Sequence, residues 1–181
     1  MNRYCLIKSL GDERMTSQST NISLFKEAMG NYPTGVTVVT AYDENDNPIG
    51  LTVNSFASVS LDPLLILWSI DKKVFTYETF KKIDKFAVNI LAGDQKDMAM
   101  LFATKDADRF GHTNWHKSEF GLPILDGSLA GLQCETFQAV EAGDHTIMIG
   151  EVKEIHVENK DPLLYHARNI GPFPQEFHAK D

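Results

Sequence analysis

The sequence predicts a mainly β protein, an antiparallel β-barrel with helices at its rim. Segments rich in β-branched and aromatic residues recur along the chain and are joined by short turns, as in antiparallel sheets. Only a few segments have apolar residues at helical spacing. They do not alternate with the strands as a doubly wound parallel sheet would require.

The first element that the pattern predicts is a helix over residues 22–31 (ISLFKEAMGN). Its apolar residues recur at a helical period, Ser23 is a candidate N-cap, and Gly30 is a candidate end of the last turn. The apolar positions are Ile22, Leu24, Phe25, Ala28 and Met29.

A β-hairpin is predicted next. Residues 35–42 (GVTVVTAY) and about 50–60 are strand-like, and the turn residues Asp, Asn, Pro and Gly cluster between them. A further strand is expected over 64–70. We therefore expect three consecutive strands in this part of the chain.

Two helices and three strands are expected in the rest. Residues 74–83 and 94–104 have helical spacing, and 86–91 (FAVNIL) is typical of a short buried strand. Residues 105–125 are predicted to be irregular. Two strands then follow around a Gly-Asp turn, namely 129–141 and 145–158.

The length of 181 residues fits one domain with a real core. We expect a flexible N-terminal arm over 1–20, the domain over 21–171 and a tail over 172–181. The N-terminal segment lacks a signal-peptide pattern, and Met15 is an alternative start.

Composition and charge disfavour several classes of partner. The net charge of −8 repels nucleic acid and anionic membrane surfaces, and no apolar run approaches the length of a membrane span. Cys5 and Cys134 are far apart and have no partner motif. We therefore expect a cytoplasmic protein rather than a disulfide-stabilised one.

The second strand of the hairpin carries neutral polar residues. Alternation places Thr52, Asn54, Ser58 and Ser60 on one face, with Ser55 as an exception, and apolar residues on the face toward the core. Such hydroxyls and amides suit a flat ligand that forms hydrogen bonds. A solvated sheet face would have the same composition, so both interpretations stay open on this stretch alone.

A series of blocks resembles the flavin reductase family, which has the FMN-binding split-barrel fold. The blocks are YPTGVTVVTA, GLTVNSFASVSLDPLLILWSI, FAVNIL, FATKDADRFG and LAGLQCETFQAVEAGDHTIMIGEV, and they cover roughly residues 22–170. The resemblance implies a six-stranded Greek-key barrel, usually a homodimer. It also implies an enzyme that uses NADH or NADPH to reduce a flavin (FMN or FAD), often for a partner monooxygenase.

The resemblance also implies a set of flavin-binding residues, and it places His145 near the nicotinamide as the catalytic residue. After Tyr165 the sequence departs from the family's pattern, because the usual glycine and basic residue are replaced by HARN. The expected cofactor-binding residues are Pro33, Thr34, Gly35, Thr52, Asn54, Ser55, Ser58, Ser60, Ala87, Val88, Asn89, Phe102, Arg109, Phe110, Gly143, Asp144, His145 and Tyr165.

The expected chemistry needs no nucleophile from the protein, because hydride passes directly between two cofactors. The protein must hold two flat rings together. In agreement, the sequence has no GxSxG motif and no GxGxxG motif after a strand. Two other functions stay open: a flavin carrier, store or sensor without turnover, and an oxidase for a small amine or pyridoxal compound.

Several of these residues also have a purely structural interpretation. Asn54 could cap a bulge, Arg109 could pair with Asp106 or Asp108, His145 could be a turn residue, and Phe102 could belong to the core. Lys72 and Lys73 are expected in an exposed loop. The HxxxH pair His112 and His116 has metal-ligand spacing, but the surrounding residues disfavour a helix and no third ligand is evident, so no metal is expected. Trp115 is expected to cover the pocket or pack the loop.

Overall fold

The computed structural model describes residues 19–177, and the chain divides into two compact units. One unit contains the residues up to Pro33 together with His166–Asn169, and the other contains the rest. Most of the predicted N-terminal arm, with Cys5 and Met15, lies outside the described residues. Among residues 19–177, no helix is both long and apolar enough to cross a membrane.

The first unit contains the predicted N-terminal helix, which spans residues 19–31. Ser23 is therefore inside the helix and is not its N-cap. The amide of Asn31 donates to the Glu27 carbonyl at 2.9 Å in the last turn. The apolar side chains that predicted the helix are not covered by the described chain, since Ile22, Leu24, Phe25 and Met29 are each half exposed or more.

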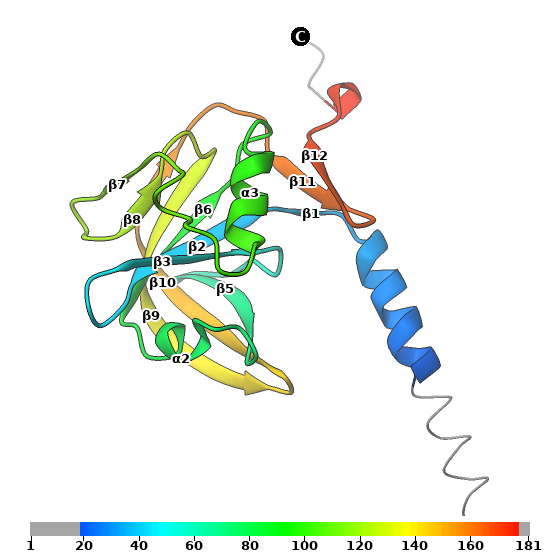
Figure 1. Cartoon of the computed structure of the whole chain (residues 1–181), viewed down its shortest axis with the longest axis horizontal. Helices are drawn as coiled ribbons and strands as arrows, with labels where there is room; N and C mark the ends of the chain where they lie inside the picture. Colours follow the sequence, from blue (N-terminus) through cyan, green and yellow to red (C-terminus); the bar gives the residue numbers. More distant parts are fainter. Residues whose placement is uncertain (1–18, 178–181) are drawn as a thin grey trace, which may run out of the picture. The chain divides into compact units, whose positions relative to one another are not determined.

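The second unit is built on one antiparallel sheet of seven strands in the order β3-β2-β6-β9-β10-β5-β4 (Figure 1). The prediction of a mainly antiparallel β protein is confirmed, with seven strands rather than the six expected. The strands are β2 (Thr37–Tyr42), β3 (Pro48–Val53), β4 (Ala57–Leu61), β5 (Leu64–Asp71), β6 (Lys85–Ile90), β9 (Ala130–Ala142) and β10 (His145–Val157).

Smaller elements complete the fold. A second sheet has the order β1-β11-β12, and β7 pairs with β8 as a short hairpin within the stretch predicted to be irregular. Helix α3 lies where it was predicted, whereas α2 is much shorter than the predicted 74–83. These elements are β1 (Thr34–Gly35), β7 (Trp115–Lys117), β8 (Pro123–Leu125), β11 (Leu163–His166), β12 (Asn169–Pro172), α2 (Tyr77–Phe80), α3 (Lys96–Ala103) and the 3-10 helix Gln175–Phe177.

The predicted hairpin turn after β2 is confirmed, and Asp43 stabilises it. One Asp43 carboxylate oxygen accepts the backbone N–H groups of Asn45 and Asn47 at 2.9 and 2.8 Å. These hydrogen bonds hold the pKa of Asp43 below its usual value, with the contacts to Asn47 contributing most. Asp46 has a positive φ of 58°, which aspartate tolerates better than most residues.

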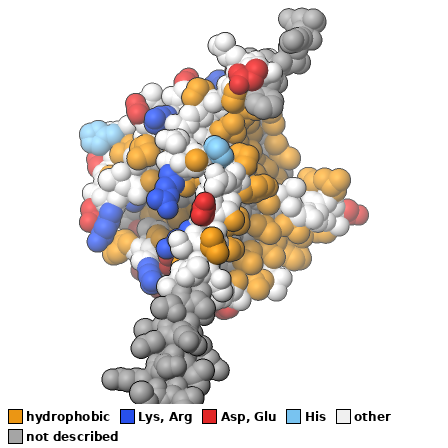
Figure 2. All heavy atoms as spheres, turned by 90° about the vertical axis from the view of Figure 1, so that its right-hand side faces the viewer, with side chains coloured by type: hydrophobic (Ala, Val, Ile, Leu, Met, Phe, Trp, Pro, Cys, Tyr) orange, Lys and Arg blue, Asp and Glu red, His pale blue; other side chains and the backbone are white. Residues whose placement is uncertain are grey.

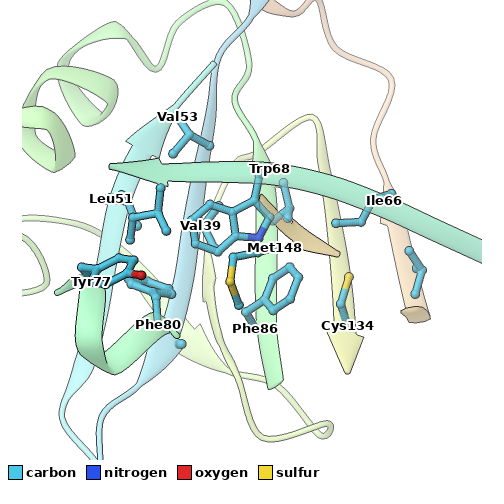
Figure 3. Packing of buried hydrophobic residues seen from close by; sticks show 14 residues of the cluster. Val39, Leu51, Val53, Ile66, Trp68, Tyr77, Phe80, Phe86, Cys134 and Met148 are labelled. Atoms are coloured by element: carbon cyan, nitrogen blue, oxygen red, sulfur yellow. The ribbon is translucent and has the colours of Figure 1, made fainter. Parts of the chain in front are cut away.

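The main core lies between the strands of the large sheet and α2 (Figure 3). Trp68 of β5 is at its centre and meets Phe80 and Phe86 edge to face, with ring centroids 5.4 and 5.7 Å apart. Its buried Nε1–H has no hydrogen-bond partner among the described residues. Gly150 of β10 gives Phe86 room, because a Cβ there would lie 2.4 Å from the Phe86 ring.

The predicted continuous strand over 50–60 is wrong, because the chain leaves the sheet between β3 and β4. Alternation correctly places Leu51 and Val53 in the core. It fails beyond the break, where Val59 is 48% and Leu61 87% exposed. Because the chain leaves the sheet between β3 and β4, the alternation of buried and exposed residues in β3 does not continue into β4.

Candidate functional site

Several predicted site segments are connected through strand pairings and hydrogen bonds of the large sheet. Thr37, at the start of β2, pairs with Val53 at the end of β3 and donates its hydroxyl to the Val53 carbonyl at 3.1 Å. The segment after β3 then attaches to β5, whose last residue Asp71 pairs with His145. Consecutive contacts therefore link the segments that contain Thr37, Asn54 and His145. The strand registers place Thr37 toward the start of β9 and His145 at its end.

Ser55 makes the link to β5. Its hydroxyl accepts the Ser69 backbone N–H at 2.9 Å and lies 3.3 Å from the Ser69 carbonyl. The Ser55 side chain is thus used to fasten the connection between β3 and β4. Asn54, its neighbour, is exposed at this junction.

The first and last predicted blocks are joined by the pairing of β1 with β11. Thr34 lies opposite Tyr165, and both are half-buried. The Thr34 hydroxyl is buried but has no hydrogen-bond partner. Pro33 and Gly35 are exposed, and a Cβ at Gly35 would meet nothing within 4 Å. The side of β1 at Gly35 is therefore open.

A second, smaller core gathers the aromatic site residues around α3. Phe102 is buried, and its ring meets that of Phe110 edge to face at 5.3 Å. Phe110 in turn meets Trp115 at 5.3 Å, and the Trp115 indole donates to the Phe110 carbonyl at 3.2 Å. Tyr165 also packs against this core. Trp115 therefore packs the loop, one of the two roles expected for it.

Arg109 does not form the surface ion pair that was its alternative role. Its Nη2 donates to the Thr104 carbonyl at 2.8 Å, and its Nε is buried without a partner. Asp108 instead accepts the Gly111 backbone N–H at 3.0 Å. The arginine is held at the end of α3 with hydrogen-bonding capacity left over.

Some predicted contact residues are buried or use their polar groups in hydrogen bonds within the protein. Thr52 donates its hydroxyl to the Ala99 carbonyl at 2.7 Å, which ties β3 to α3. Ala87, Val88 and Asn89 of β6 have no exposed surface. The Asn89 amide is saturated by Val38, Thr40 and Leu125. This placement does not support ligand contact by the three β6 side chains.

Ser58 and Ser60 lie on β4, away from the junction described above. They pair with Ile66 and Leu65 near the start of β5, whereas the junction involves its last residues. Ser60 accepts the Asp62 backbone N–H at 3.2 Å. Within this chain the structure therefore does not bring these two serines to the other candidate residues.

The predicted Gly-Asp turn between β9 and β10 carries His145. Gly143 has a φ of +64°, a conformation that glycine adopts without a steric cost. The His145 Nδ1 lies 2.8 Å from a carboxylate oxygen of Asp144, and this hydrogen bond holds the pKa of Asp144 below its usual value. A partner on one ring nitrogen fixes the orientation of the imidazole, and the His145 side chain remains 43% exposed.

Sequence reasoning missed the residues that support this turn. Lys72 lies in an exposed loop, as expected, but it also bonds to the turn through its backbone and its side chain. Only the register between β5 and β10 brings the two segments together, and no local pattern gives that register. His112 and His116 form no metal cluster within residues 19–177, and His116 instead lies 2.6 Å from Asp126.

The described residues form a mainly antiparallel β protein with few helices. The chain belongs to the family described as flavin reductase like domain, whose model matches residues 29–174.

Named relatives support this membership. The NADH-dependent FMN reductase SmoA of Agrobacterium fabrum is 40% identical over 156 residues, which is 86% of this chain and 88% of SmoA. The reductase component of the trigonelline monooxygenase of Acinetobacter baylyi is 49% identical over 128 residues. That match covers 71% of this chain but only 41% of the longer relative.

A solved structure gives the same result. The NADH:FAD oxidoreductase SgcE6 of Streptomyces globisporus, in complex with NAD and FAD fragments, superimposes with a TM-score of 0.81 at 32% identity. The match covers 87% of this chain and 96% of SgcE6.

Proposed function

We propose that this protein is an NAD(P)H-dependent flavin reductase that acts on FMN or FAD. The observation that carries the proposal is the match to the flavin reductase family over residues 29–174, which is most of the chain. When bound, the flavin accepts a hydride from the nicotinamide. The protein's task is then to hold both rings and to exclude water.

The residues present fit a flavin. A buried polar atom without a partner is unfavourable, and both the Thr34 hydroxyl and the Arg109 Nε are in that state. A ligand that offers acceptor groups would satisfy them. We assign Thr34 and the exposed Asn54 to the isoalloxazine ring and Arg109 to the phosphate, with Tyr165, which pairs with Thr34, at the edge of the proposed flavin site.

His145 is assigned to the nicotinamide side. Asp144 orients its ring through Nδ1, which leaves Nε2 for the bound nucleotide or reduced flavin. Loss of one such contact, worth roughly 1.4 kcal/mol, should lower kcat/KM about tenfold.

The test is a steady-state assay of NADH and NADPH oxidation with added FMN or FAD. Flavin-dependent oxidation is expected with the wild-type chain, and kcat/KM should fall about tenfold or more in His145→Ala. The matched control is His156→Ala, on the same strand but beside Glu158. A chain that binds flavin yet oxidises neither nucleotide would instead be a carrier, store or sensor.

We further propose that the large sheet closes into the family's split barrel. Its two end strands are β3 and β4, and the Ser55–Ser69 bonds attach the segment between them to β5. One core, with side chains from β2, β3, β5, β6, β9 and β10, would fill the barrel.

A homodimer is also proposed. Hydrophobic side chains are exposed over much of the face shown in Figure 2. The large hydrophobic side chains that are exposed in the described chain include Leu61 of β4, Leu64 of β5 and Val157 of β10. Exposed apolar surface of this kind marks association sites, and a two-fold pair would bury it. Light scattering should find a dimer that Leu61→Glu weakens, whereas Phe75→Glu, at an exposed loop position, should leave it intact. A monomeric wild-type chain would contradict the proposal.

Reduced flavin from this enzyme would serve a separate oxygenase. Relatives bear names such as the reductase component of trigonelline monooxygenase and the reductase subunit HsaB of a flavin-dependent monooxygenase. We propose a partner monooxygenase in the same compartment. The free, buried Cys134 accords with the reducing cytoplasm.

A further inference from the structure

The turn that carries His145 is fastened to the end of β5 by Lys72. The Lys72 backbone N–H donates to the Asp144 carbonyl at 3.0 Å, and its Nζ donates to the Gly143 carbonyl at 2.8 Å. The same Nζ lies 2.6 Å from the Glu141 carboxylate. A single residue therefore contacts the three positions that lead into the turn and form it.

Glu141 extends this contact to the other side of the turn. It pairs with Thr146 across the hairpin, and Thr146 is completely buried. The Tyr77 hydroxyl lies 2.9 Å from the Thr146 hydroxyl and donates to Glu141 at 3.4 Å. Lys81 adds a second cation, 3.0 Å from the same carboxylate. The residues before and after Asp144–His145 are thus both held.

The charges of Lys72, Lys81 and Glu141 favour this arrangement at neutral pH. The hydrogen bond from Lys72, and then that from Lys81, lowers the pKa of Glu141 to about 2. The carboxylate is therefore ionised at neutral pH. An ion pair of partly exposed groups contributes little by itself, and Lys72 and Glu141 are 35% and 54% exposed. What distinguishes Lys72 from Lys81 is its direct bond to a backbone carbonyl of the turn.

We propose that Lys72 is a positioning residue for the reductase reaction. Together with Glu141 it fixes the turn so that His145 presents its ring to the nicotinamide. Lys72 makes no contact with the reacting rings in this scheme and acts only through His145. The inference rests on the proposed function for the role of His145, but the clamp itself is a property of the chain.

Three neighbouring lysines provide a graded test. Lys72 contacts the turn and Glu141, Lys81 contacts Glu141 only, and Lys82 is in none of the ion pairs of the described chain. We expect Lys72→Met to raise the KM for NADH about tenfold, with flavin affinity within about twofold of wild type. Lys81→Met should have a small effect and Lys82→Met none. Lys72→Arg keeps a donor for the carbonyl and should recover most of the loss.

A double variant separates positioning from direct contact. If Lys72 acts through His145, then adding Lys72→Met to His145→Ala should cost little further activity. Additive losses would mean that Lys72 meets the nucleotide itself, and would overturn the proposal. Equal kinetics for Lys72→Met and Lys82→Met would overturn it as well.

Hydrogen–deuterium exchange tests the clamp without reference to activity. Peptides that span 141–148 should exchange about tenfold faster in Lys72→Met than in wild type, and as in wild type in Lys82→Met. Unchanged exchange in Lys72→Met would refute the clamp. Absence of NAD(P)H oxidation in the wild-type chain would refute the proposed function instead, so the two failures can be told apart.

Discussion

Asn89 gives the sharpest contrast between a binding and a structural role. The family resemblance predicts flavin contact, yet the side chain is completely buried. Its Nδ2 donates to the Val38 carbonyl and the Thr40 hydroxyl, each at 3.0 Å, and its Oδ1 accepts the Leu125 N–H at 2.9 Å. Asn89→Leu, a change of similar volume, removes three hydrogen bonds at roughly 1 kcal/mol each, or about 3 kcal/mol of unfolding free energy.

Urea unfolding of the flavin-free protein, followed by circular dichroism at one protein concentration, measures this loss. Flavin affinity of the folded variant should stay within about twofold of wild type. Asn54→Ala is the reciprocal control, because the exposed Asn54 should change stability by less than about 0.5 kcal/mol and weaken flavin binding. An Asn89→Leu protein that keeps its stability but binds flavin about tenfold more weakly would refute the reasoning.

Three further predictions concern the fold and its charges. Glu141 should stabilise the native state fully above about pH 4.5, its ordinary pKa, and lose that contribution as the pH falls toward its native pKa of about 2; unfolding curves of wild type and Glu141→Gln should therefore converge over that range. Burial raises the pKa of the Cys134 thiol to about 12, so in a Cys5→Ser background a thiol reagent should react only after denaturation, and fast labelling of the native protein would contradict this. Gly150→Ala places a methyl group 2.4 Å from the Phe86 ring and should cost about 1–3 kcal/mol of stability, whereas Gly171→Ala, with open space at its Cβ, should be tolerated; equal melting temperatures would count against the packing described here.

Much of the fold could be predicted because the signals are local. A few adjacent residues are enough to predict the turn at Asp43, the β-branched strand β2 and the apolar face of α3. The break between β3 and β4 could not be predicted, since it depends on Ser55 bonding to Ser69 on another strand. The exposure of Leu61 and Phe25 could not be predicted either, because periodicity reports an apolar face but not what covers it.

The candidate site also has a part that the sequence predicts and a part that only the fold shows. The types of residue at Thr34, Asn54 and His145 can be read from the sequence, whereas the pairing partners of their strands come only from the fold. Asn89 and Thr52 are equally polar in the sequence, but the fold uses their hydrogen bonds internally. Lys72 is the reverse case: nothing in the sequence marks it as a site residue, but the pairing of β5 with β10 brings it to the His145 turn.

The central claim is that the chain holds a flavin whose exposed side meets a nicotinamide next to the His145 turn. Anaerobic mixing of the protein with FMN and an excess of NADH or NADPH tests this most directly, by the loss of the yellow colour of oxidised flavin in a rapid-mixing experiment. The account predicts fast bleaching that is markedly slowed in His145→Ala and unaffected in His156→Ala. Bleaching no faster than that of free flavin with either nucleotide would contradict it.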